Sequence, residues 1–229
     1  MIKDFDLLQR ANNDYTTIDL EHAEELAYRE LIDSIRYISL GDECGVMGNI
    51  ANIITYKGRF YIQEEQFDRV FIYDDTGRCL KKIDNKGRGP GEYLRIESID
   101  INTEKEELML VDGMSDKLFF YDLDGNFKSI HSIRYFQTEN TLCLRDSVFL
   151  HISAPSQNFG NDGLYGYALV LSKGNENFLK GYRYLPLQVG YKGGGQIFKG
   201  YERSCYHPIY SDTIYQILSD TTYGPIFYF

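Results

Sequence analysis

The sequence predicts an all-β protein, a β-propeller with four-stranded antiparallel blades that repeat about every 48 residues. The first observation is an internal repeat between residues 60 and 128. Four unlike residue types recur at one offset: Asp68, Arg69, Tyr73 and Gly77 return 48 positions later as Asp116, Lys117, Tyr121 and Gly125. The second observation is the composition, because 20 Tyr, 14 Phe and 21 Gly with no Trp suit half-buried strands joined by tight turns.

Each of the first two units divides into four short strands. In the first unit we expect strands at residues 50–56, 59–63, 69–73 and 78–83. In the second unit we expect them at residues 96–101, 107–111, 117–121 and 126–133. Asp75–Gly77 and Asp124–Asn126 place residues that tolerate positive φ between the third and fourth strands. Such a unit is typical of a propeller blade.

The third and fourth units are more divergent. In the third we expect strands at residues 147–153, 167–172 and 178–184, with an insertion-like loop at 154–166. The fourth unit begins near Gly195, includes a strand at 213–217 and ends in an apolar run before Phe229. The chain therefore holds about four blades. Larger rings are commoner for blades of this size, so we expect these blades to be part of a six-bladed ring that is incomplete at the C-terminus.

Residues 1–34 differ from the repeats and are predicted as an N-terminal extension. Between Asp19 and Asp33, apolar residues recur at helical spacing after an acidic start, which predicts a short helix. Residues 35–40 then alternate as I-R-Y-I-S-L, which indicates a lone strand. In a closed propeller this strand would complete the last blade and hide its edge. We therefore assign residues 35–229 to the propeller, with 35–40 as its closing strand.

The net charge and the lack of an apolar segment limit the classes of function that the sequence favours. A formal net charge of −10 makes nucleic acid a poor partner, since an acidic surface repels phosphate. No apolar stretch approaches the roughly 20 residues of a transmembrane helix, and the sequence shows no signal peptide or lipidation site. The cysteines are widely spaced and form no C-x-x-C motif, so isolated buried thiols are the default and a disulfide stays open. They are Cys44, Cys79, Cys143 and Cys205.

A glycine-rich stretch stands between the first two units. It consists of Lys86, Gly87, Arg88, Gly89, Pro90, Gly91, Glu92 and Tyr93. A dinucleotide fingerprint needs its third glycine one residue later and a helix after it, whereas a strand is expected here. A structural interpretation is better, because the glycines allow a tight path, Pro90 fixes φ and Glu92 can accept hydrogen bonds. We predict that this stretch is an inter-blade joint.

Candidate catalytic and metal-binding residues are few. The four histidines are scattered, no G-x-S-x-G motif occurs, and the acidic run from Asp122 lacks the Gly and Glu positions of a calcium loop. The innermost strands of a propeller line its channel, and Asn52, Asp100 and Asn102 are the polar candidates there. We predict no catalytic residue, no metal site and no cofactor. Calcium in the channel would follow only from analogy with other six-bladed propellers.

Several segments together carry a family resemblance. They are I-D-L-E at 18–21, L-I-D-S-I-R-Y-I-S-L at 31–40, G-R-G-P-G-E-Y at 87–93, D-I-N at 100–102, L-V-D at 110–112 and D-T-I-Y-Q-I at 212–217. In order and spacing the chain resembles the NHL-like six-bladed β-propeller proteins common in gut Bacteroidota, which often carry a domain-of-unknown-function label. The resemblance implies a secreted or lipid-anchored protein of the periplasm or cell surface. It brings no catalytic residues.

Two functions follow as hypotheses. The first is a non-catalytic binding or scaffold propeller of the cell envelope that recognises a glycan, a peptide or a protein, since propellers present loops around a rigid ring. The alternative is a metal-assisted hydrolase or lyase acting in the central channel, with Asp100, Asn52 and Asn102 as ligands. The lack of a catalytic constellation in the sequence favours the first hypothesis.

Overall fold

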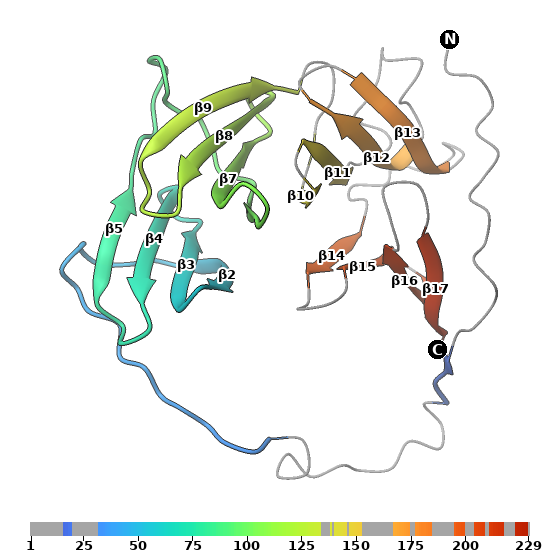
Figure 1. Cartoon of the computed structure of the whole chain (residues 1–229), viewed down its shortest axis with the longest axis horizontal. Coiled ribbons are helices and arrows are strands. Elements are labelled where there is room, and N and C mark those ends of the chain that lie inside the picture. The colour runs from blue at the N-terminus through green and yellow to red at the C-terminus, as the bar shows by residue number, and fades with distance from the viewer. Residues whose placement is uncertain are drawn as a thin grey trace.

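The computed structural model describes residues 16–19, 32–133, 138, 140–145, 147–152, 167–174, 177–184, 195–199, 204–208, 211–217 and 223–228. These residues form four sheets, each with four consecutive antiparallel strands, and the last sheet has a short fifth strand in addition. The sheets lie around a common centre in chain order, and we call them blades 1 to 4 (Figure 1). The predicted all-β architecture of four-stranded blades is confirmed.

The strands of each blade follow one another along the chain. Blade 1 consists of β2 (Ile50–Tyr56), β3 (Arg59–Glu64), β4 (Arg69–Asp74) and β5 (Cys79–Ile83). Blade 2 consists of β6 (Ser98–Asn102), β7 (Glu107–Asp112), β8 (Lys117–Asp122) and β9 (Phe127–Ser132). Blade 3 consists of β10 (Asn140–Arg145), β11 (Val148–Ile152), β12 (Tyr167–Lys173) and β13 (Asn177–Tyr184). Blade 4 consists of β14 (Gln196–Lys199), β15 (Ser204–His207), β16 (Thr213–Ile217) and β17 (Tyr223–Tyr228).

Backbone conformation explains why the unit repeats so regularly. Asp68 and Asp116, between the second and third strands of their blades, have φ of 57° and 53°. Gly77 and Gly125, between the third and fourth strands, have φ of 89° and 79°. Glycine adopts this region without the steric cost that a Cβ brings. The 48-residue offset in the sequence is therefore an offset between equivalent turns.

The core lies between the blades, because side chains alternate from face to face along each strand. Tyr61 of blade 1 shares a buried cluster with Phe119 of blade 2. Phe120, on the opposite face of blade 2, packs with Phe149 of blade 3, and their ring centroids are 6.1 Å apart. The far face of blade 3 shares a buried cluster with Tyr206 of blade 4. Consecutive blades are thus held together face to face.

The expected closing strand at residues 35–40 is not a strand. Ile35 and Tyr37 are exposed, so the apolar alternation there does not correspond to a buried face. Residues 36–48, which we call the strap, instead run along blade 1, where the Gly41 N–H donates to Gly77 O at 2.8 Å. The edge of blade 4 pairs with another segment: β1 (Thr16–Thr17) lies parallel to β17.

Two further expectations fall outside the described residues. Most of the predicted helix at residues 19–33 and the whole insertion-like loop at 154–166 belong to this part of the chain. Across the residues that the structure does describe, no helix has the length and apolar character to cross a membrane.

Candidate functional site

The glycine-rich stretch at residues 86–93 folds into a closed loop between blades 1 and 2. The Gly87 N–H donates to Tyr93 O at 2.9 Å, and the Tyr93 N–H donates to Asn85 O at 3.1 Å. The Tyr93 side chain is fully buried. Its hydroxyl donates to Asp68 O at 2.8 Å and accepts the Asn85 N–H at 3.1 Å. Tyr93 therefore ties the loop to the turn between β3 and β4.

The Glu92 carboxylate accepts a backbone N–H of the glycine-rich loop. In a phosphate-binding loop, such N–H groups would donate to the phosphate instead. The Glu92 carboxylate accepts the Gly89 N–H at 2.7 Å and lies against the backbone of Gly87. Lys86 forms an ion pair with Asp68 rather than pointing to a ligand. The remaining members of the stretch occupy exposed or half-buried loop positions: Arg88, Pro90 and Gly91. The geometry is that of an internal joint whose own carboxylate fills the loop.

Asp100, expected to line the channel, forms an ion pair between non-adjacent blades. Its carboxylate on β6 is 2% exposed, and both of its oxygens lie 2.9 Å from Nζ of Lys199 on β14. Oδ2 also accepts the N–H of Cys143 on β10 at 2.8 Å. Burial raises the pKa of Asp100, and the Lys199 ammonium opposes that shift. The inner strands of blades 2, 3 and 4 therefore meet at one carboxylate.

The other two channel candidates, Asn102 and Asn52, have surroundings different from those of Asp100. Asn102 is buried, and its Oδ1 accepts the N–H groups of Glu104 at 3.1 Å and Lys105 at 3.0 Å in the turn after β6. Asn52 is exposed on β2. Among the described residues, no three His, Cys, Asp or Glu side chains gather where they could hold a metal ion. Of the three residues that the sequence suggested as ligands, Asp100 is paired with Lys199, Asn102 accepts hydrogen bonds in its own turn, and Asn52 is exposed.

A buried polar chain in blade 3 was not anticipated from the sequence. His151 is fully buried, with Nδ1 2.9 Å from the Thr141 hydroxyl and Nε2 2.7 Å from the Ser172 hydroxyl. Burial lowers the pKa of His151 to about 3, so the imidazole is neutral at physiological pH. Residues 141, 151 and 172 come to lie on one face because β10, β11 and β12 pair in this register, and no local sequence pattern indicates that register. We interpret the chain as a structural link between β10, β11 and β12.

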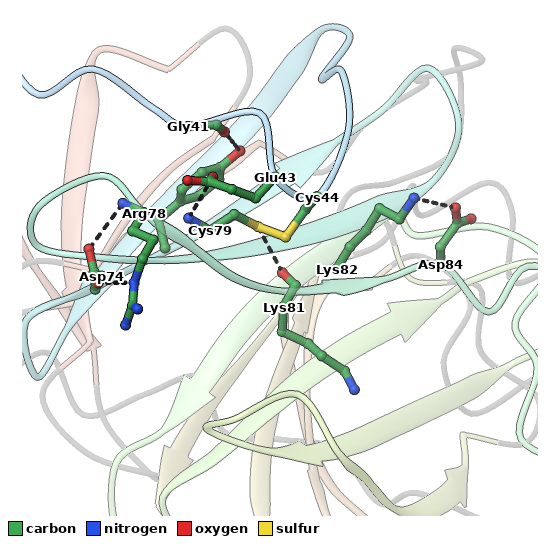
Figure 2. Close-up of a disulfide and its surroundings, with 10 residues drawn as sticks. Gly41, Glu43, Cys44, Asp74, Arg78, Cys79, Lys81, Lys82 and Asp84 are labelled. Carbon is green, nitrogen blue, oxygen red and sulfur yellow. Dashed lines mark hydrogen bonds and ion pairs between the residues drawn. A yellow bond between two sulfur atoms is a disulfide. The ribbon is translucent and has the colours of Figure 1, made fainter.

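A disulfide fixes the strap to blade 1, as Figure 2 shows. Cys44 of the strap is bonded to Cys79 on β5, and their Cα atoms are 6.0 Å apart. The Glu43 carboxylate accepts the Cys79 N–H at 3.3 Å beside the bond. The default expectation of isolated thiols is wrong for this pair. Cys143 and Cys205 lie outside the disulfide.

Under the strap lies the outward face of blade 1, which is the face turned away from blade 2. Ile62, Phe71 and Tyr73 are buried there, with Cys44 and Met47 of the strap packed against them. The 48-residue repeat identifies the equivalent face of blade 2. The equivalent residues of blade 2, 48 positions later, pack against blade 1 in the inter-blade core; they are Leu110, Phe119 and Tyr121. The strap thus covers a face of the kind that elsewhere in the chain receives a whole blade.

Exposed apolar side chains concentrate on blade 1, on its strap and on the residues just before the strap, and we call them the blade 1 surface. Of the eleven large hydrophobic residues exposed in the described part of the chain, nine lie between residues 32 and 80. They are Ile32, Ile35, Tyr37, Leu40, Val46, Ile50, Ile53, Phe67 and Leu80. The other two, Met114 and Phe127, belong to blade 2. Singly scattered apolar residues are ordinary, whereas a concentration in one part of the fold indicates an interaction surface.

The family comparison covers nearly the whole chain. A family model described as "Domain of unknown function (DUF4934)" matches residues 15–229. No curated protein is significantly similar in sequence.

Solved structures share the fold at low sequence identity. A Bacteroides fragilis protein named as exported has a TM-score of 0.74 at 18% identity, and the match covers 86% of this chain and 55% of that one. A member of the DUF4221 family from Bacteroides vulgatus has a TM-score of 0.51 at 11% identity, covering 79% of this chain and 57% of that one. A Bacteroides fragilis protein named as a 6-phosphogluconolactonase has a TM-score of 0.50 at 11% identity, covering 78% and 56%. The chain spans little more than half the length of these structures.

Proposed function

The chain belongs to the DUF4934 family, and from this premise we propose that it is a non-catalytic binding scaffold of the cell envelope whose partner is a protein or peptide. The observation that carries the proposal is the blade 1 surface. Ile50 and Ile53 on β2 are 49% and 51% exposed although both pair with residues of β3. Apolar area of this kind is recovered when another protein covers it.

The cell-envelope part of the proposal is supported by two findings. The Cys44–Cys79 disulfide is of a kind that persists in oxidising compartments and is rare in the cytosol. The similar structure from Bacteroides fragilis with the TM-score of 0.74 is named as an exported protein. We extend the proposal to an NHL-like, six-bladed ring in a periplasmic or surface-exposed lipoprotein of Bacteroidota. These finer features rest on the sequence resemblance.

A protein or peptide is favoured over a glycan because of what the surface offers. Sugar-binding sites combine aromatic rings with converging hydrogen-bonding side chains, whereas aliphatic residues dominate here. Ile32, Ile35, Ile50 and Ile53 are all exposed. The likeness to the protein named as a lactonase carries only the fold, so it adds nothing for an enzymatic function.

The test is photo-crosslinking at defined positions with envelope proteins of the producing bacterium. A crosslinking amino acid at position 53 should capture a discrete partner, and one at position 114 on blade 2 should not. The double variant Ile50→Asp/Ile53→Asp should weaken binding of that partner by about tenfold or more, because charge is introduced into an apolar contact. Met114→Asp/Phe127→Asp is the matched control, and it should bind like the wild type.

Two results would count against the proposal. Equal binding by the blade 1 and blade 2 variants would show that the surface is not the docking site. Binding to a glycan array that is insensitive to Ile50→Asp/Ile53→Asp would replace the protein partner with a sugar bound elsewhere. Thermal unfolding of both double variants checks that the substitutions leave the fold intact.

A further inference from the structure

The Asp100 carboxylate belongs to a cage of oxygen atoms around one ammonium group. Lys199 Nζ lies 2.9 Å from each Asp100 oxygen, 2.8 Å from Ile101 O and 3.4 Å from Cys143 O. An ammonium group carries three N–H donors and no acceptor. The cage presents acceptors from three sources, one carboxylate and two carbonyls. The number of these acceptors and their chemical type match the three N–H donors of a primary ammonium group.

The same cage suits a metal ion poorly. Ca²⁺ takes about six to eight oxygen ligands at about 2.3–2.6 Å. Here four oxygens from three residues stand at hydrogen-bonding distances from a nitrogen. The Asp100 side chain is 2% exposed, so its charge needs a cation beside it, and Lys199, whose side chain is 31% exposed, supplies one from the solvent-accessible side.

We propose that Asp100, together with the carbonyl groups of Ile101 and Cys143, forms a binding site for a primary ammonium group at the inner edge of the blades, and that Lys199 is its built-in occupant. The ligand class is a primary alkylammonium, such as the end of a lysine side chain or of a polyamine. An occupied site joins β6, β10 and β14, so it pins blade 4 to blades 2 and 3. The inference concerns the channel wall and is independent of the envelope partner proposed above.

Rescue of a truncated lysine by free amines tests the proposal. Lys199→Ala leaves the Asp100 charge buried, and we expect the Tm to fall by about 4–8 °C, the effect of losing one partner of a partly buried pair in a domain of this size. Excess propylammonium chloride should restore about half of that loss or more, because a ligand that binds only the folded state stabilises it. Tetramethylammonium chloride, with the same charge and no N–H donor, should restore none.

Two controls separate the cage from general charge effects. Lys57→Ala removes a lysine that pairs with Glu106 on the surface, so it should unfold at the wild-type temperature and ignore propylammonium. Lys199→Ala/Asp100→Asn should also show no rescue, because the cage has lost its carboxylate. Equal stabilisation of Lys199→Ala by propylammonium and tetramethylammonium would overturn the proposal. So would equal stabilisation by calcium, which would make the cage a general cation site.

The wild-type protein offers a readout that does not depend on the folding of Lys199→Ala. A caged ammonium must leave its acceptors before it can be acylated. We therefore expect acetic anhydride to modify Lys199 several-fold more slowly than Lys57, as followed by peptide mass spectrometry. Asp100→Asn should speed the modification of Lys199 and leave that of Lys57 unchanged. Equal rates at Lys199 and Lys57 in the wild type would contradict the cage.

Discussion

Removal of the Cys44–Cys79 disulfide tests how the strap is held. The two cysteines are 35 residues apart in sequence, so the bond restricts the unfolded chain over a loop of that length. The chain-entropy relation assigns about 4 kcal/mol to such a loop at 25 °C, and native disulfides commonly contribute about 2–4 kcal/mol. We expect Cys44→Ser/Cys79→Ser to lose free energy of unfolding in this range. For a domain of this size the loss lowers the Tm by about 5–15 °C.

The assay compares thermal unfolding of the wild type, with and without dithiothreitol, with that of the double variant. The reduced wild type and Cys44→Ser/Cys79→Ser should unfold at the same temperature, because both lack the same cross-link. Cys143→Ser/Cys205→Ser is the matched control. Those residues lie outside the disulfide, so reduction should lower the Tm of this variant by as much as it lowers the Tm of the wild type.

Three outcomes would refute the reasoning about the strap. The first is a change in Tm of less than about 2 °C when the wild type is reduced, which is below the smallest contribution expected of this loop. The second is a non-reducing peptide map in which Cys44 is not joined to Cys79. The third is loss of the reduction effect in Cys143→Ser/Cys205→Ser, which would move the stabilising bond to another pair.

Further predictions concern the joint, blade 3 and a turn. Tyr93→Phe should cost about 1–3 kcal/mol in urea unfolding, because Asp68 O loses a buried donor, whereas Tyr37→Phe on the surface should cost nothing measurable. The pKa of His151 is about 3, so below about pH 6.5 only the unfolded chain takes up a proton there. Stability should therefore fall by about 2 kcal/mol from pH 7 to pH 5, and His151→Gln should flatten this slope. Gly77→Ala should cost about 1–3 kcal/mol by the same urea assay, because φ is 89° and the added methyl meets the Ser39 carbonyl.

Blades 1 and 2 could be predicted from the sequence because their determinants are local. A strand needs alternation over a few residues, and a tight turn needs Gly or Asp at one position. Both kinds of signal repeat with the same offset, and every strand of these blades lies within two residues of its expected position. The sequence does not predict β10 of blade 3, since its unit departs from the repeat.

The strap could not be predicted, because it depends on contacts between segments distant in sequence. The alternation in residues 35–40 is the signal of a strand, yet a strand also needs an edge with which to pair. No local pattern indicates that Cys44 reaches Cys79 or that Met47 packs on blade 1. The bond joins the strap to a face that β3, β4 and β5 build from residues later in the sequence.

The channel candidates illustrate a similar division. Asp100 is a polar residue on a predicted inner strand, and the structure places it at the inner edge of the blades (Figure 1). Its partner Lys199 is 99 residues away, and sequence reasoning had no means to join the two. Asn102 fits the same pattern of residue type and strand, but the turn that follows uses its side chain as a cap. The residue types of Asp100 and Asn102 therefore predict that both lie on an inner strand, whereas the role of each side chain depends on the residues packed around it.

The strap also explains why exposed apolar residues concentrate on and beside blade 1. A blade between two others has both faces covered by four strands, whereas the outward face of blade 1 is covered by a single extended segment. The strap buries Ile62 and Tyr73, yet Ile53, which pairs with Ile62 and shares its face, remains half exposed. Because the disulfide fixes the strap over this face, the bond also limits the size of the blade 1 surface. Reduction should therefore uncover Tyr73 and its neighbours and increase the binding of apolar dyes, together with the loss of stability described above.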